Sequence, residues 1–333
     1  MSSVYFKTVT DEKKDTKKSK VAKALSQLPV TSGSRWGAEH LKACHVVVNS
    51  KVGDSLPVLN SYHHTIRETF KPGKENAQIA AFIKDLAPEY RNMRQHALVR
   101  EPEVGATLAR FWTALRDVKT MKSDEEEQQP IQGSFTSEQR PAAHLPVEVY
   151  TVELAFAAIN HTLLYTQNPS SEMPVEIRQQ ERCFIQIGNK RITAIDDGGL
   201  TLIVDDGEKT EKSVVLLEAK RRLDVCDEAN RPFVSDELLG QMTCEAIAAR
   251  SSRQGDNERN DMIIVNTTQQ YMCFFHFIIT ADHLRDIEYG RIPGQAIKVT
   301  ATHWFNLERP PDRECIVKNV LQLAEYMSPV LEK

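Results

Sequence analysis

Three pairs of short runs rich in Val, Ile and Phe follow one another between residues 182 and 280, and they constrain the fold more than any other feature. Turn-forming residues separate the two runs of each pair, as is typical of antiparallel strands. Segments with helical spacing precede, interrupt and follow them. The pattern predicts an α/β fold with one central mixed sheet flanked by helices. The expected strands are 182–187, 191–195, 200–204, 213–220, 262–266 and 272–280, and the expected helices are 147–165, 235–251 and 312–331.

The chain before residue 121 has a different pattern. Apolar residues recur every three or four positions over 79–90 and 106–118, which predicts a helical N-terminal region over 25–121. Residues 122–146 contain DEEEQQP and several turn formers, a composition typical of an exposed linker. Since 333 residues suit two units, we place an α/β domain after this linker, over 147–333. Residues 1–24, with seven lysines and three acidic residues, are expected to be a disordered basic tail.

Composition narrows the class of protein. Hydrophobic residues make up 41% of the chain and charged residues 26%, as in ordinary globular proteins. The longest apolar run, residues 149–165, is interrupted by polar residues, so no membrane contact is expected. The chain opens without an apolar signal segment, and its six cysteines have no CxxC spacing, which favours an intracellular location, cytoplasmic or nuclear. The net charge of −4 means that any polyanion must be bound through local positive charge.

The run SVVLLEAK, residues 213–220, ends in two charged residues. Residues two apart on a strand share a face, so Glu218 and Lys220 are expected to point the same way as Leu216. A carboxylate and an ammonium on an apolar face need partners or a function. The alternative is a charged pair at an exposed strand end.

A second acidic group opens the preceding strand of the same predicted hairpin. Asp197 is followed by two glycines, which permit close approach of another backbone. An antiparallel return brings Asp197 beside Glu218. Their carboxylates and the carbonyl of Ala219 are oxygen ligands that suit Mg²⁺ or Mn²⁺.

The order of acidic residue, hairpin, Glu-x-Lys and a helix bearing Gln241 resembles the PD-(D/E)XK nuclease superfamily, the fold of restriction endonucleases, over residues 147–280. The resemblance implies that Asp197 and Glu218 bind the metal ion. It further implies that Lys220 positions and helps to deprotonate the attacking water, and that Gln241 supports the site. The residue before Asp197 is Asp196, where the family has Pro, so the choice between these two aspartates stays open.

Many branches of this superfamily carry a further acidic residue on the helix before the sheet. Glu153 is the one charged residue between 149 and 165, and the resemblance implies that it is a further catalytic residue and metal ligand. An alternative is that Glu153 pairs with an arginine of the helical region. Gln241 likewise has a structural alternative, as a solvated residue of an amphipathic helix.

The resemblance implies a metal-dependent phosphodiesterase that cleaves nucleic acid, with DNA expected and RNA an alternative. Five arginines near the site would supply positive charge for phosphates. They are Arg221, Arg222, Arg250, Arg253 and Arg259. The competing hypothesis is an inactive nuclease-like interaction module that binds protein or nucleic acid, with the helical N-terminal region contacting a protein partner. Nuclease-like proteins of fungi with long helical N-terminal regions are similar in this organisation.

Other motifs indicate no further chemistry. His40, Cys44 and His45 are metal-ligand types, but a second ligand pair is missing, so packing or surface roles are favoured. No Walker or Rossmann glycine loop, GxSxG or HExxH is present in the sequence.

Overall fold

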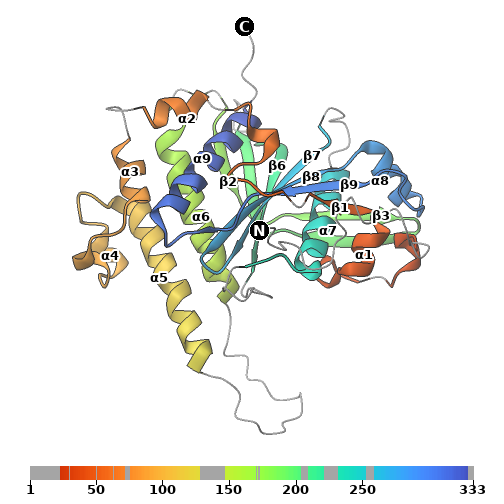
Figure 1. The fold of residues 1–333 in the computed structure, drawn as a ribbon, viewed down its shortest axis with the longest axis horizontal. Coiled ribbons are helices and arrows are strands. Elements are labelled where there is room, and N and C mark those ends of the chain that lie inside the picture. Colours follow the sequence, from red (N-terminus) through yellow and green to blue (C-terminus); the bar gives the residue numbers. More distant parts are fainter. Residues whose placement is uncertain are drawn as a thin grey trace.

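The structure is a computed structural model that describes residues 23–29, 31–49, 51–62, 64–71, 76–127, 147–169, 171, 173–203, 209–220, 232–252 and 259–328. A mixed sheet forms its centre and has helices on both faces (Figure 1), which confirms the predicted α/β class. Neighbouring strands lie in the order β1-β9-β8-β7-β6-β5-β2, with β10 paired to β8, and β3 and β4 form a separate two-stranded sheet. The strands are β1 Val46–Val48, β2 Val175–Arg178, β3 Arg182–Ile187, β4 Lys190–Ile195, β5 Gly198–Ile203, β6 Lys209–Lys220, β7 Asp261–Thr268, β8 Tyr271–Ile278, β9 Ile297–Ala301 and β10 Phe305–Asn306.

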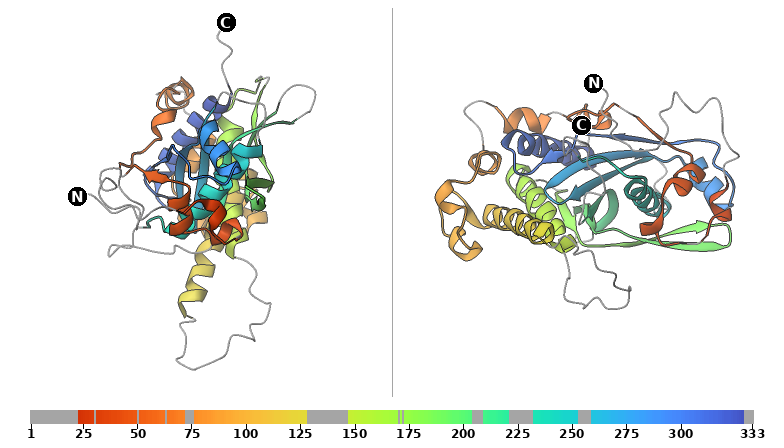
Figure 2. Two further views of the ribbon diagram at one scale, coloured as in Figure 1. Left: turned by 90° about the vertical axis from the view of Figure 1, so that its right-hand side faces the viewer. Right: turned by 60° about the horizontal axis from the view of Figure 1, so that its bottom comes forward.

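The helices surround this sheet. The helices α2 to α5 gather on one side of the molecule, beside α6 and α9, whereas α1 lies on the other side, against α7 (Figures 1 and 2). The α-helices are α1 Ala38–Ala43, α2 His64–Thr69, α3 Ala77–Ile83, α4 Gln95–Leu98, α5 Gly105–Glu127, α6 Val147–Thr166, α7 Asp236–Ser252, α8 Ala281–Glu288 and α9 Pro310–Met327. Short 3-10 turns are η1 Leu25–Gln27, η2 Gly33–Arg35, η3 Pro57–Leu59 and η4 Pro88–Tyr90.

All three predicted strand pairs are confirmed, with the correction that the first pair, β3 and β4, lies outside the central sheet in which all six strands were expected. β3 pairs with β4, β5 with β6, and β7 with β8, each antiparallel. β6 and β7 run parallel, and α7 lies between them in the chain as the crossover that a parallel pair requires. The carboxyl end of β6 therefore lies beside that of β7, because Lys220 is in register with Thr268.

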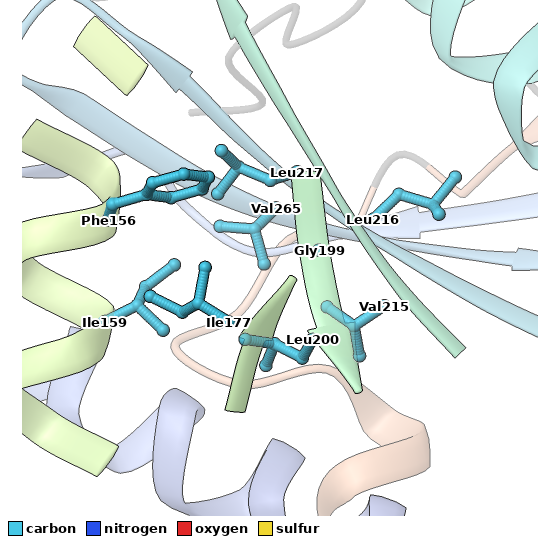
Figure 3. Close-up of a pocket in the computed structure, with 9 residues that line it drawn as sticks. All are labelled: Phe156, Ile159, Ile177, Gly199, Leu200, Val215, Leu216, Leu217 and Val265. Atoms are coloured by element: carbon cyan, nitrogen blue, oxygen red, sulfur yellow. The ribbon is translucent and has the colours of Figure 1, made fainter. Parts of the chain in front are cut away.

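Alternate side chains of β6 enter two different hydrophobic cores. Val215 and Leu217 pack beneath α6 and α9, whereas Leu216 packs on the other face with α7. Figure 3 shows Phe156 and Ile159 of α6 facing the sheet around a small apolar cavity of about 10 Å³. A cavity of this size has room for about one water but offers it no polar partners, so the face under α6 is dry packing. The face that continues from Leu216 to Glu218 is the α7 face.

The N-terminal region is mostly helical, as predicted, with one correction. Its run of three valines, Val46–Val48, forms β1 and pairs in parallel with β9, because β-branched residues suit a strand that is buried in a sheet. Other parts of this region pack against α6 and α9 in one shared core, through side chains such as Leu56, Phe82 and Phe111.

The predicted linker begins later than expected. α5 continues to Glu127, so residues 122–127 are helical, since Lys and Glu favour a helix as readily as a solvated linker. Residues 128–146 lie outside the described residues, as do residues 1–22 of the predicted tail, and the boundary between two domains stays a prediction. Within the described ranges, no helix combines the length and apolarity that would let it span a membrane.

Candidate active site

Glu218 is a buried carboxylate at the carboxyl end of β6. It is 1% exposed, and its Oε1 accepts hydrogen bonds from Lys220 Nζ at 2.5 Å and Gln241 Nε2 at 2.6 Å. The amide of Asn266 on β7 donates to the main-chain carbonyl of Glu218. The side chains of Glu218 and Lys220 thus share one strand face, as predicted, and the alternative of an exposed surface pair does not fit the burial of Glu218.

Gln241 links two acidic groups. Its Nε2 donates to Glu218 Oε1 and also, at 2.9 Å, to Oε1 of Glu245, which lies one turn further along α7. Glu245 is 4% exposed, and its Oε2 has no hydrogen-bond partner among the residues that the structure describes. The half-buried Gln241 is therefore not a solvated residue, and it orients the carboxylate of Glu218.

The two candidate aspartates have different surroundings. Asp196 is 4% exposed, and its carboxylate forms two hydrogen bonds with the Arg178 guanidinium and accepts from the amides of Glu181 and Gly198. These partners occupy Asp196 in holding β2, β4 and β5 together. Asp197 instead turns toward β6, where its Oδ2 accepts the Ala219 amide at 2.8 Å. The geometry therefore favours Asp197 for the site.

The glycines after Asp197 permit this arrangement. Gly198 has φ 145°, and a Cβ there would lie 2.7 Å from the ring of Phe156. A Cβ on Gly199 would lie 2.4 Å from the carbonyl oxygen of Val215. The close approach of backbones expected at this glycine pair is confirmed, and it brings Asp197 beside the end of β6.

Glu148 completes the acidic cluster. It lies in the first turn of α6, where the helix dipole favours a negative charge. Carboxylate oxygens of Glu148, Asp197 and Glu218 all lie within 4.8 Å of one another. Lys220 Nζ is 3.7 Å from Glu148 Oε1, so the ammonium lies between two of these carboxylates.

The prediction that Glu153 belongs to this cluster is corrected. Its carboxylate pairs with Arg110 of α5, at the surface, and both side chains are more than 40% exposed. Five positions along an α-helix rotate a side chain by about 140°, so Glu153 and Glu148 lie on different faces of α6. The alternative pairing of Glu153 with an arginine of the helical region is the one observed.

In the absence of a cation, the charged forms of the carboxylates in this cluster are disfavoured. Burial raises the pKa of Glu218 to about 7, against the attraction of Lys220 and with repulsion from Asp197. Burial also raises the pKa of Asp197, and burial together with the charge of Glu218 raises that of Glu245 well above its usual range. Burial opposes the charged form of Lys220, but attraction to Glu218 outweighs it and raises the pKa, so the amine stays protonated.

These residues fit a divalent cation. Among the described residues, the site brings together four carboxylates and the single ammonium of Lys220, so one positive charge cannot neutralise all four acidic groups. The four carboxylates are those of Glu148, Asp197, Glu218 and Glu245. A cluster of carboxylate oxygens at this separation supplies the hard ligands that Mg²⁺ and Mn²⁺ prefer. Glu148, Asp197 and Glu218 would hold the ion. The ligand role expected for the Ala219 carbonyl stays a prediction.

Two acidic residues of this site, Glu148 and Glu245, were not predicted from the sequence, although a local sequence pattern indicates the position of each. Pro146 before Val147 is typical of a helix start and would place Glu148 in the first turn. Glu245 is four residues after Gln241, a spacing that puts both on one helix face.

Five arginines were expected beside the site, and the structure describes two of them, each with its own surroundings. Arg250 is 5% exposed within α7, and Arg259 contacts the ring and main-chain carbonyl of Tyr326 on α9. The other three arginines, Arg221, Arg222 and Arg253, lie outside the described residues.

The other residues of metal-ligand type, around His40 and Cys44, have a packing role. The His40 ring stacks on Trp36, with 5.1 Å between ring centroids. Cys44 is fully buried, and burial raises the pKa of its thiol. Among the described residues, the one acidic or His/Cys cluster that could hold a metal ion is Glu148, Asp197 and Glu218.

Comparison with known proteins yields no family for this chain. Its sequence matches no protein-family model and no curated protein.

Proposed function

We propose that the protein is a metal-dependent phosphodiesterase that cleaves nucleic acid, DNA in the first place, and that it shares the site organisation of PD-(D/E)XK nucleases. One observation carries the proposal: Glu148, Asp197 and Glu218 bring carboxylate oxygens within 4.8 Å of one another, with the ammonium of Lys220 beside two of them. Three carboxylates alone would suit many cation sites. The protonated amine next to them adds a donor for a water or a phosphate oxygen.

Each residue has a distinct role in this proposal. A bound Mg²⁺ or Mn²⁺ would offset phosphate charge and lower the pKa of a coordinated water. Glu148, Asp197 and Glu218 hold the ion, and the Ala219 amide orients Asp197. Lys220 acts as a hydrogen-bond donor rather than as a base, because its raised pKa keeps it protonated.

Gln241 is a positioning residue. Its amide donates to the carboxylates of both Glu218 and Glu245, two buried groups that repel each other when both are charged. The carboxylate of Glu218 is thereby held in one orientation beside Glu148 and Asp197, ready for a cation.

The experiment is a cleavage assay on single-stranded DNA, duplex DNA and RNA in Mg²⁺, in Mn²⁺ and in EDTA. We expect metal-dependent cleavage by the wild type and none by Asp197→Asn, which keeps an oxygen for the Ala219 amide but removes the charge. Arg100→Ala, a change at an exposed arginine of the helical region, is the matched control and should cleave as the wild type does.

The competing hypothesis of an inactive interaction module is tested in the same assay. Wild type that cleaves none of the three substrates in Mg²⁺ or Mn²⁺ would reject the enzyme, whether or not it binds these ions in calorimetry.

A further inference from the structure

The β3–β4 hairpin forms a ribbon outside the central sheet. Its inner side chains, among them Ile185 and Ile192, pack on α7 within the second hydrophobic core. Figure 2 (right) shows the two green strands along the lower edge of the molecule in that view. The ribbon has a buried face and a face that looks away from α7.

The outer face of this ribbon is cationic. Its cross-strand pairs are Arg182 with Ile195, Phe184 with Thr193, and Gln186 with Arg191. It contains two arginines and no carboxylate, although the whole chain has a net charge of −4. Both arginines are exposed, and neither forms an ion pair with any residue that the structure describes. The face is therefore complementary to a polyanion.

One arginine of the ribbon forms a flat platform. The guanidinium of Arg191 lies over the ring of Phe184, 3.6 Å from its centroid. Unpaired nucleobases stack on guanidinium planes and aromatic rings, whereas the bases of a duplex already stack on each other. The platform thus suits a strand with unpaired bases better than a duplex.

The ribbon leads directly to the acidic cluster. β4 ends at Ile195, two residues before Asp197, and Arg182 pairs with Ile195. Arg191 lies six residues before Asp197, or about 20 Å along an extended chain. Two exposed apolar side chains are close in sequence to the candidate ligands: Ile195, two residues before Asp197, is 40% exposed, and Val149, next to Glu148, is 53% exposed. Cationic and apolar contacts therefore continue from the ribbon to the candidate metal ligands.

We infer that the outer face of the β3–β4 ribbon binds single-stranded DNA and guides it to the acidic cluster. Arg182 and Arg191 contact phosphates, the Arg191–Phe184 platform stacks on a base, and Ile195 and Val149 contact sugars or bases beside the reacting phosphate. The inference rests on the proposed function and names the form of substrate and the surface that binds it.

The test measures binding of fluorescein-labelled oligothymidine by anisotropy, in EDTA to prevent cleavage, over a range of salt concentrations. Arg182→Ala and Arg191→Ala should each weaken binding about fivefold to tenfold, and each should reduce the slope of log K against log [salt] by about 0.7. Phe184→Leu should weaken binding without changing this slope. Arg100→Ala, two residues after α4, a helix that lies on the side of the molecule opposite β3 (Figure 1), should bind as the wild type does.

All variants are first checked for wild-type melting, which is expected because both arginines are exposed. If either fails to fold as the wild type does, Arg182→Gln and Arg191→Gln, which also remove the charge, take their place. Unchanged binding by both arginine variants overturns the inference, as does absence of binding by the wild type or equally tight binding of an oligo(dA)·oligo(dT) duplex. Metal-dependent cleavage is assayed separately. Ribbon-dependent binding without any cleavage would reject the proposed function alone, and cleavage with ribbon-independent binding would reject this inference alone.

Discussion

Lys220 Nζ lies 2.5 Å from Glu218 Oε1, so two residues on one face of β6 form an ion pair in which the carboxylate is 1% exposed. A buried carboxylate is costly unless it is paired, and burial raises the pKa of Glu218 more than the attraction of Lys220 lowers it. Lys220 therefore serves as the counter-charge of Glu218 in the protein alone, and as a donor toward a substrate in the proposed reaction.

Substitution of these two residues should separate their roles. Lys220→Ala should abolish cleavage and retain or increase Mn²⁺ affinity, because a positive charge beside the ligands is removed. It should also lower the free energy of unfolding in EDTA by about 1–3 kcal/mol, since Glu218 loses a partner. Glu218→Ala should lose Mn²⁺ binding as well as cleavage. Titration calorimetry and a cleavage assay measure both effects, and undiminished cleavage by Lys220→Ala would refute its role.

The two glutamates of α6 offer a matched comparison. Glu148→Gln should weaken Mn²⁺ affinity at least about tenfold, because a ligand is lost. Glu153→Gln removes a carboxylate from the same helix but only breaks an exposed pair with Arg110, so affinity should not change and stability should change by less than about 1 kcal/mol. Equal affinities of the two variants for Mn²⁺ in calorimetry would exclude Glu148 from the metal site.

Substitution of the two neighbouring aspartates should change different properties: stability for Asp196 and metal binding for Asp197. Asp196→Ala removes the buried carboxylate that pairs with the Arg178 guanidinium and leaves it the more exposed Glu181, which should cost about 3–5 kcal/mol in the free energy of unfolding. Asp197→Asn should cost less than about 1 kcal/mol, because an amide oxygen still accepts from Ala219, yet it should lose metal binding. Urea denaturation and calorimetry measure these effects. Loss of Mn²⁺ binding by a folded Asp196→Ala variant together with full binding by Asp197→Asn would reverse the assignment.

A buried histidine should make the fold sensitive to acid. His161 is 0% exposed; its Nε2 lies 3.0 Å from the carbonyl oxygen of Gln78 and its Nδ1 2.9 Å from Thr107 Oγ1. Burial lowers its pKa below the usual 6.5, against the opposing hydrogen bond to Gln78. The unfolded chain therefore binds more protons below pH 6.5, so the stabilisation by neutral His161 is complete above that pH and lost as the pH falls toward the folded pKa.

The measurement is the free energy of unfolding by urea between neutral pH and pH 5, in EDTA. His161→Gln should lose less stability than the wild type over this interval, because glutamine does not titrate. His303→Gln, at an exposed histidine, is the control and should follow the wild type. Parallel pH profiles for His161→Gln and the wild type would contradict the assignment.

Much of the fold follows from local patterns. The runs around Gly188 and after residue 200 predicted β3 to β6 because turn formers between β-branched runs act over a few residues. The sharing of one strand face by Glu218 and Lys220 also follows from local geometry alone. By contrast, the three valines of β1 enter the sheet only through β9, which lies about 250 residues away in sequence.

The sequence by itself determined the α/β class, the strand that ends in Glu218 and Lys220, and the glycine pair that lets Asp197 approach it, because each depends on neighbours in the chain. Only the tertiary structure decided which aspartate and which glutamate face the cluster. Asp196 is taken by Arg178 and Glu153 by Arg110, whereas Glu148 faces the site because α6 crosses the sheet with its first turn beside Lys220. The direction of a helix over a sheet depends on the packing of distant residues, here Phe156 and Ile159 against β5, β6 and β7 (Figure 3), and no local pattern encodes it.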